Sequence, residues 1–261
     1  MRWGAAIGRL GLAWLCLWVF LAATSPPKEL DRLAGYDQRL GASLPMELAV
    51  IDAQGRTVPL RAVLHGRPAI LALGYFDCPN LCDTVLQNLA HGIAASGDRP
   101  GQDMQVIFAS VDPHDDPEAA RHAMRQWALR TPDANVSRWA FLTGEGVSQL
   151  AAAVGFRYFY EARLGQYVHP AGLVVVTPQG RIAQYMMGVD YPPRTLHLAL
   201  VEASRGQLGS LTDRLVLLCC GYDPSTGRYS LLIGKTMRVA GMAFLALLLG
   251  VLAWLLRSRR T

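Results

Sequence analysis

Short apolar runs of strand length alternate with helical stripes through the middle of the chain, and this alternation restricts the fold most. Ala69–Phe76 and Met104–Val111 are apolar enough for buried strands. Between them, Leu81–Ala95 repeats its apolar residues at helical spacing. A sheet built from such units must be covered on both faces, so the sequence predicts an α/β domain at residues 44–205.

The remaining elements of this domain follow from the same patterns. Two turn sequences, Asp52–Gly55 and Thr177–Gly180, each separate a pair of apolar runs and predict hairpins. A helix should begin at Asp116 and Pro117, an acidic cap followed by proline in the first turn. The other predicted strands are Leu48–Ile51, Thr57–Leu60, Trp139–Leu142, Phe156–Tyr160, Leu173–Val176 and Arg181–Met186, and the other predicted helices are Glu145–Val154 and Pro192–Ser204.

The two ends of the chain have a different character. Arg2 and Arg9 precede the apolar run Leu10–Ala23, which predicts a signal peptide or an uncleaved anchor at residues 1–23. At the other end, Val239–Leu256 is an unbroken apolar run, about 27 Å long as a helix and enough to cross a bilayer. We interpret residues 24–43 as a linker, 206–238 as a connector and 257–261 as a basic cytosolic tail.

Charge distribution supports this layout. Residues 1–23 and 235–261 together carry seven basic residues and no acid. Subtracting these seven charges from the formal net charge of +5 leaves −2 for residues 24–234. A nucleic-acid-binding surface on the folded part is therefore not expected. The positive-inside rule places the basic ends in the cytosol and the domain on the periplasmic or extracytoplasmic side of the inner membrane, an oxidising compartment.

Reactive chemistry is concentrated at Cys78 and Cys82, directly after a predicted buried strand and at the start of a predicted helix. A spacing of four places both sulfurs on one face of the first helical turn. The helix N-terminus should favour thiolates, which bind metals and attack disulfides. The same pair can also form a disulfide, so the sequence supports both metal binding and redox chemistry.

A third ligand is needed for most metals, and His169 is the candidate. It is followed by Pro170 and precedes the apolar strand Leu173–Val176. Two thiolates and one imidazole form a soft ligand set that suits Cu(I) and also binds Cu(II). Zinc would prefer a fourth ligand. The alternative for a single histidine, a hydrogen-bonded loop residue, stays open at this point.

Three motifs in order resemble the Sco/SenC family. Tyr75–Cys82 (YFDCPNLC) is similar to the family signature T-x-C-P-x-x-C, Ser110–Asp116 to its S-V-D-P…D segment, and His169 stands where its copper-binding histidine is expected. The resemblance covers about residues 44–204. It implies a thioredoxin-like fold, copper bound by Cys78, Cys82 and His169, and delivery of copper to the binuclear copper site of cytochrome c oxidase.

Some residues depart from the family pattern. Asn80 replaces an acid in the Cys loop, and Asp77 beside Cys78 either restores that charge or raises the thiol pKa. Pro170 stands where Ser or Thr is usual, so it either acts like the cis-proline of thioredoxins or is an ordinary trans-proline that ends a loop.

A second pair of cysteines, Cys219 and Cys220, is expected to consist of buried small residues. The alternative is a second site that binds a soft metal or relays thiol exchange.

The sequence thus predicts a membrane-tethered copper metallochaperone. Its expected partners are the copper-site subunit of cytochrome c oxidase and another periplasmic copper chaperone. In the alternative function, Cys78 and Cys82 are the catalytic redox pair of a thiol–disulfide oxidoreductase that keeps the oxidase cysteines reduced. A tethered redox sensor is a third, weaker hypothesis, because the tail at 257–261 is too short for an output domain.

Overall fold

The computed structural model describes residues 33–78 and 81–206 continuously, together with 222–223, 228–229, 241–242, 244 and 248. The predicted signal or anchor, nearly all of the connector and the C-terminal span, and the basic tail lie outside the described residues. Among the helices that are described, none combines the length and the apolar character needed to cross a membrane.

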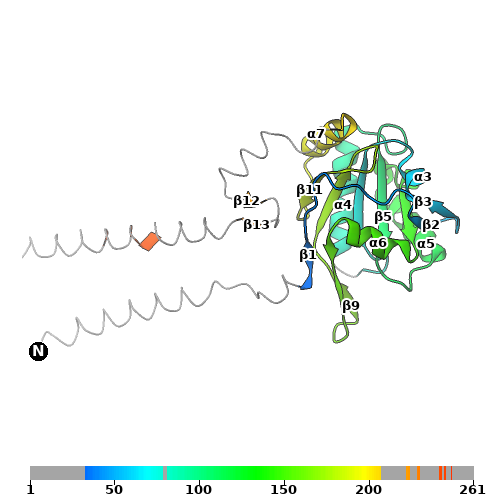
Figure 1. Ribbon diagram of the computed structural model, residues 1–261, viewed down its shortest axis with the longest axis horizontal. Coiled ribbons are helices and arrows are strands. Elements are labelled where there is room, and N and C mark those ends of the chain that lie inside the picture. The colour runs from blue at the N-terminus through cyan, green and yellow to red at the C-terminus, as the bar shows by residue number, and fades with distance from the viewer. Residues whose placement is uncertain are drawn as a thin grey trace, which may run out of the picture.

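Strands and helices alternate through the described domain (Figure 1). Its strands are β1 (Gly35–Tyr36), β2 (Ala49–Asp52), β3 (Thr57–Pro59), β4 (Ala69–Gly74), β5 (Gln105–Ser110), β6 (Ala140–Thr143), β7 (Phe156–Arg157), β8 (Phe159–Glu161), β9 (Gln166–Val168), β10 (Gly172–Val176) and β11 (Ile182–Met187). Its helices are α3 (Leu60–Leu64), α4 (Leu81–Ser96), α5 (Pro117–Arg130), α6 (Gly146–Ala153) and α7 (Pro193–Ser204), with short 3-10 turns at Pro132–Ala134 and Val136–Arg138. A small pair, β12 (Tyr222–Asp223) and β13 (Arg228–Tyr229), follows the domain.

The central sheet is mixed and has seven strands in the order β11-β10-β4-β5-β6-β2-β3. β4 pairs with β5, and β5 with β6, in parallel. Every other pairing in the sheet is antiparallel: β10 with β4, β11 with β10, β2 with β6 and β3 with β2. The parallel centre is connected through α4 and α5, as the alternating pattern predicted. The predicted α/β, thioredoxin-like architecture is therefore confirmed.

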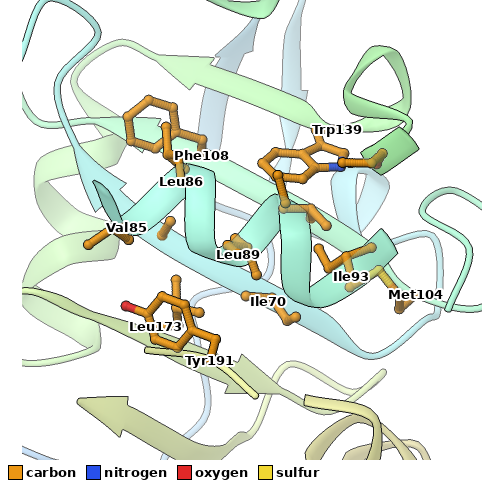
Figure 2. Close-up of a cluster of buried hydrophobic side chains, with 14 of the residues drawn as sticks. Ile70, Val85, Leu86, Leu89, Ile93, Met104, Phe108, Trp139, Leu173 and Tyr191 are labelled. Atoms are coloured by element: carbon orange, nitrogen blue, oxygen red, sulfur yellow. The ribbon is translucent and has the colours of Figure 1, made fainter. Parts of the chain in front are cut away.

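Helices cover both faces of this sheet because successive side chains of the buried strands point in opposite directions. Ile70 and Ala72 of β4 belong to the core beneath α4, α5 and α7, whereas Leu71 and Leu73 belong to the core beneath α3 and α6. Figure 2 shows the first of these cores, where the apolar stripe of α4 lies against the sheet.

Two predicted elements differ from the structure. The predicted strand Thr57–Leu60 ends at Pro59, and α3 begins with Leu60, because proline cannot donate to the sheet ladder and here precedes the first helical turn. The predicted strand Phe156–Tyr160 is divided at Tyr158. Its first part, β7, pairs with β1, and its second part, β8, pairs with β9 in a hairpin that projects from the domain (Figure 1).

The pairing of β4 with β10 positions the reactive residues. The two strands are antiparallel, and Ala72 of β4 lies opposite Leu173 of β10. The end of β4, which leads to Cys78, therefore lies beside the beginning of β10, which follows His169. Residues far apart in the sequence thus meet beyond the end of β4 and the beginning of β10.

Candidate metal and thiol site

The cysteine pair lies where β4 leads into α4. All six residues of β4 are buried, which fixes the end of the strand, and Cys82 is the second residue of α4. Cys78 lies in the preceding loop and is half-buried, whereas Cys82 is only 4% exposed. The more N-terminal thiol is therefore the more accessible one.

His169 joins the two cysteines. Its Nε2 atom lies 3.0 Å from the Cys82 Sγ atom, and one ligand atom from each of the three residues lies within 4.8 Å of the others. Within the described ranges, this is the cluster of His, Cys, Asp or Glu side chains that is compact enough to hold a metal ion. The structure therefore favours the ligand interpretation of His169 over that of an ordinary loop residue.

A second hydrogen bond of His169 fixes the protonation of its ring. The Nδ1 atom lies 3.0 Å from the Pro170 carbonyl oxygen, which can only accept. Nδ1 therefore carries a proton, and in the neutral ring Nε2 presents its lone pair toward Cys82. An imidazole oriented by a backbone carbonyl in this way is typical of metal-binding histidines.

The electrostatics of Cys82 reverse one expectation from the sequence. Its hydrogen bond with Cys78, followed by burial, raises the pKa of the Cys82 thiol far above its ordinary value. The backbone N–H of Tyr75 acts in the opposite direction but does not compensate. Helix N-terminal stabilisation thus does not make Cys82 a free thiolate, because burial and the neighbouring sulfur favour the protonated form.

The inner side of the site is tightly packed. Cys82, His169 and Gly172 border a cavity of about 10 Å³, at the lower limit for one water molecule. Gly74 approaches the site so closely that a Cβ atom there would lie 2.9 Å from the Cys82 Sγ atom and 3.2 Å from the Phe108 ring. Glycine at this position is therefore a requirement of the packing around the sulfur.

Aromatic rings brace the histidine. The centroid of the Tyr75 ring lies 6.0 Å from that of the His169 ring, and the two rings are nearly perpendicular. The centroid of the Phe156 ring lies 5.8 Å from that of the His169 ring. The Tyr75 hydroxyl is hydrogen-bonded to Cys78, and burial followed by this bond raises the pKa of Tyr75. Tyr75 therefore contacts two of the three members of the cluster, a role that its position in an apolar run did not reveal.

Asp115 is a second residue that sequence reasoning missed. Its carboxylate accepts a hydrogen bond from the Phe76 N–H at 3.0 Å and another from the Ser110 hydroxyl. Burial raises the pKa of Asp115, although these two hydrogen bonds oppose the shift. The neighbouring Asp116 caps α5 by accepting from the Glu118 and Ala119 N–H groups, as predicted. Asp115 thus ties the loop after β5 to the loop that holds Cys78.

The other residues singled out in the sequence are Pro170 and three residues that the structure does not describe. Pro170 has an ordinary trans peptide bond, so the comparison with the thioredoxin cis-proline fails. Asn80, Cys219 and Cys220 lie outside the described residues.

Fold and site together define a class of protein: a thioredoxin-like α/β domain with a Cys-x3-Cys pair and a histidine in position to bind a soft metal ion. The comparison with protein families identifies this class more narrowly. Residues 37–202 match the family described as SCO1/SenC, and the chain belongs to this family.

Solved structures share the fold. A candidate electron transport protein of Aquifex aeolicus VF5 is 25% identical, with a TM-score of 0.54, covering 65% of this chain and 100% of that protein. Arabidopsis thaliana ScoI with copper bound is 20% identical, with a TM-score of 0.51, covering 64% and 99%. BsSco, described as a member of the Sco family of cytochrome c oxidase assembly proteins with a disulfide switch, is 18% identical, with a TM-score of 0.51, covering 64% and 97%. The search of curated proteins gave no match.

Proposed function

We propose that this chain is a membrane-tethered copper metallochaperone for the binuclear copper centre of cytochrome c oxidase. Copper would be bound by the sulfurs of Cys78 and Cys82 and by the Nε2 atom of His169. The observation that carries the proposal is the clustering of these three donor atoms within 4.8 Å. Membership in the SCO1/SenC family and the copper-bound relative support the choice of metal.

The chemistry of the ligand set agrees with this proposal. Thiolate sulfur and imidazole nitrogen select copper over hard cations such as Mg²⁺ and Ca²⁺. Copper binding would displace the thiol protons, since the metal requires deprotonated sulfur. The difference in exposure supports an order in which the copper ligands would be exchanged. A partner thiolate would reach the metal from the side of Cys78, while Cys82 and His169 would hold it from within.

Anaerobic titration of the purified full-length chain with Cu(I), against a competing chelator, tests the proposal. We expect one tightly bound copper ion per chain. The double variant Cys78→Ser/Cys82→Ser is the control, because it retains the other three of the five cysteines. His169→Ala should weaken binding by about tenfold or more, since it removes one of three ligands.

Two results would contradict this function. Equal copper binding by the wild type and the double cysteine variant would show that the cluster is not the copper site. Unchanged affinity in His169→Ala would remove the histidine from the ligand set and require another donor in its place.

A thiol–disulfide oxidoreductase is the second candidate, and the contact between the two sulfurs favours it. The reduced pair would attack a disulfide in the oxidase subunit, form a mixed disulfide, and be released as Cys78–Cys82. The disulfide switch described for BsSco supports this possibility. Reduction of a model disulfide that is fast in both the wild type and His169→Ala would favour this activity, whereas copper delivery depends on the histidine.

The proposed location is the inner membrane, with the domain in the periplasm. Its support is the apolar run Val239–Leu256 followed by basic residues. Cysteine labelling with a membrane-impermeant reagent in intact spheroplasts tests this topology. Cys78 should be labelled without lysis, and a requirement for lysis would place the domain on the opposite side.

A further inference from the structure

A groove of about 750 Å³ begins at the cysteine loop and follows one face of α5. Cys78 is the member of the cluster that lines it, together with Phe76 and Asp77. Cys82 and His169 line the small inner cavity instead. The groove is therefore an approach to the site that reaches the more accessible sulfur first.

The floor of this groove is apolar. Ala123 and Trp127 of α5 are buried in the core and line the groove from below, and Phe76 closes the end near the cysteine. α5 has 14 residues and is therefore about 21 Å long. An extended peptide of about six residues would match that length.

Carboxylates gather at the end of the groove near Cys78. Asp77, Asp115 and Glu118 line this end. Asp115 is hydrogen-bonded only to neutral donors, and the described residues form no salt bridge with Asp77 or Glu118. Asp83, by contrast, is paired with Arg130 at 3.0 Å. His122, Arg125 and Arg130 also line the groove, farther along α5 than Glu118. The excess of negative charge is therefore confined to the end beside the sulfur.

We propose that this groove binds an extended segment of the partner protein that carries the reacting cysteine, with Lys or Arg beside that cysteine. The inference rests on the proposed function, because both copper transfer and thiol exchange need a partner cysteine at Cys78. Charge complementarity selects a basic segment, and the apolar floor accommodates its backbone and aliphatic side-chain stems.

Two peptides test the charge preference. They are identical hexapeptides with one cysteine, flanked by Lys in one and by Glu in the other, each joined to thionitrobenzoate by a disulfide. The Cys78 thiolate attacks the peptide sulfur, the Cys78–peptide disulfide forms, and thionitrobenzoate leaves as a coloured thiolate with the electron pair of the broken bond. Cys82 then attacks Cys78, and the peptide leaves as a thiolate.

The rate of thionitrobenzoate release by the reduced full-length chain is measured for both peptides. The rate of the Cys78→Ser variant is subtracted, and the rates with mercaptoethanol, an uncharged thiol, correct for intrinsic reactivity. We expect the Lys peptide to react about five times faster at low salt, with the difference shrinking at high salt. A corrected ratio near one would overturn the proposal.

Matched variants assign the preference to the groove. Glu118→Gln should reduce the ratio, whereas Glu202→Gln on α7 removes the same charge elsewhere and should leave it unchanged. An equal reduction in both variants would show a general field of the molecule and contradict a specific groove.

A steric pair tests the position of the bound segment. Gln126 and Leu129 are both exposed on α5, but only Gln126 lines the groove. Gln126→Trp should slow the Lys peptide about fivefold and leave the rate with the mixed disulfide of mercaptoethanol and thionitrobenzoate unchanged, because that probe is too small to occupy the groove. Leu129→Trp should change neither rate. Equal rates in the two variants would exclude the groove, and because copper is absent from this assay, its result is distinct from that of the copper titration.

Discussion

At the scale of single residues, the cluster of Cys78, Cys82 and His169 depends on neighbouring residues that are not part of it. The Pro170 carbonyl accepts a hydrogen bond from the His169 ring and so sets its tautomer, and the Tyr75 hydroxyl is hydrogen-bonded to Cys78. Cys78 and Cys82 could be predicted from spacing and chemistry, whereas His169 became a candidate ligand through the family resemblance as well. Tyr75 and Asp115 could not, because their roles depend on contacts across the fold, such as the Asp115–Phe76 bond between residues 39 positions apart.

Gly74→Ala tests the packing around the sulfur. The added Cβ atom would lie 2.9 Å from the Cys82 Sγ atom, so the sulfur or the strand must move. We expect a loss of about 1–3 kcal/mol in the free energy of unfolding and a weaker affinity for copper, measured by denaturant unfolding and copper titration. Gly97→Ala is the control, since it has φ +82 but meets no atom within 4 Å. It should lose stability and keep its copper affinity. Unchanged copper affinity in Gly74→Ala would contradict this account.

Asp115→Ala tests the tie between the two loops. It leaves the Phe76 N–H without its acceptor, which should cost about 1–3 kcal/mol of folding stability. The loop that carries Cys78 should become looser, so alkylation of Cys78 at fixed pH should change, as mass spectrometry can measure. Asp115→Asn retains an acceptor oxygen and should recover most of both properties. If the Ala and Asn variants behave alike, the hydrogen bond is not what positions the loop.

At the scale of elements, a clear apolar periodicity predicted where the long helices begin and end, whereas several short elements were not predicted. The stripe of Leu81–Ala95 predicted α4 to within one residue, and the cap at Asp116 and Pro117 predicted the start of α5. α3 has only five residues, too few for a helical period to be visible. The hairpin of β8 and β9 was not predicted as a hairpin, because its two strands pair only with each other and contain no buried residue that would give an apolar pattern.

The β2–β3 hairpin provides a prediction about pH. Burial alone would raise the pKa of Asp52, but its hydrogen bonds from Arg56 and Gln54 outweigh burial and lower it. A lowered pKa contributes stability that is present above the ordinary value near 4 and is lost as the pH falls through the folded-state pKa. Asp52→Asn should therefore destabilise the domain by about 1 kcal/mol or less at pH 7, and by less at pH 3. A loss that is the same at both pH values would show that the charge is not the cause.

At the scale of the whole molecule, the α/β architecture could be predicted because the helices α4 and α5 separate the buried strands β4, β5 and β6 in the sequence. The meeting of β10 with β4 could not be derived from periodicity, since antiparallel and parallel neighbours give the same buried pattern. That pairing brings His169 to the cysteines. The ligand set is thus a property of the sheet topology as well as of the three residues.

Copper should stabilise the entire fold, since binding would link the loop after β4 and the first turn of α4 to the segment that leads into β10. At a free Cu(I) concentration 100 times the dissociation constant, the gain is about 2.7 kcal/mol, and the melting temperature should rise by about 5–10 °C. Calorimetry with and without Cu(I) measures the shift, and a chelator should reverse it. His169→Ala should show a smaller shift at the same copper concentration. An equal shift in the variant would mean that the histidine does not hold the metal.

The distance in sequence between Cys82 and His169, 87 positions, has a consequence for the order of events in the life of the chain. A nascent or unfolded polypeptide presents two neighbouring thiols but no imidazole beside them. The third donor arrives only when β10 has docked against β4. A chain with this layout cannot offer its full coordination sphere before folding is complete, so loading with copper would itself report that a finished domain is present.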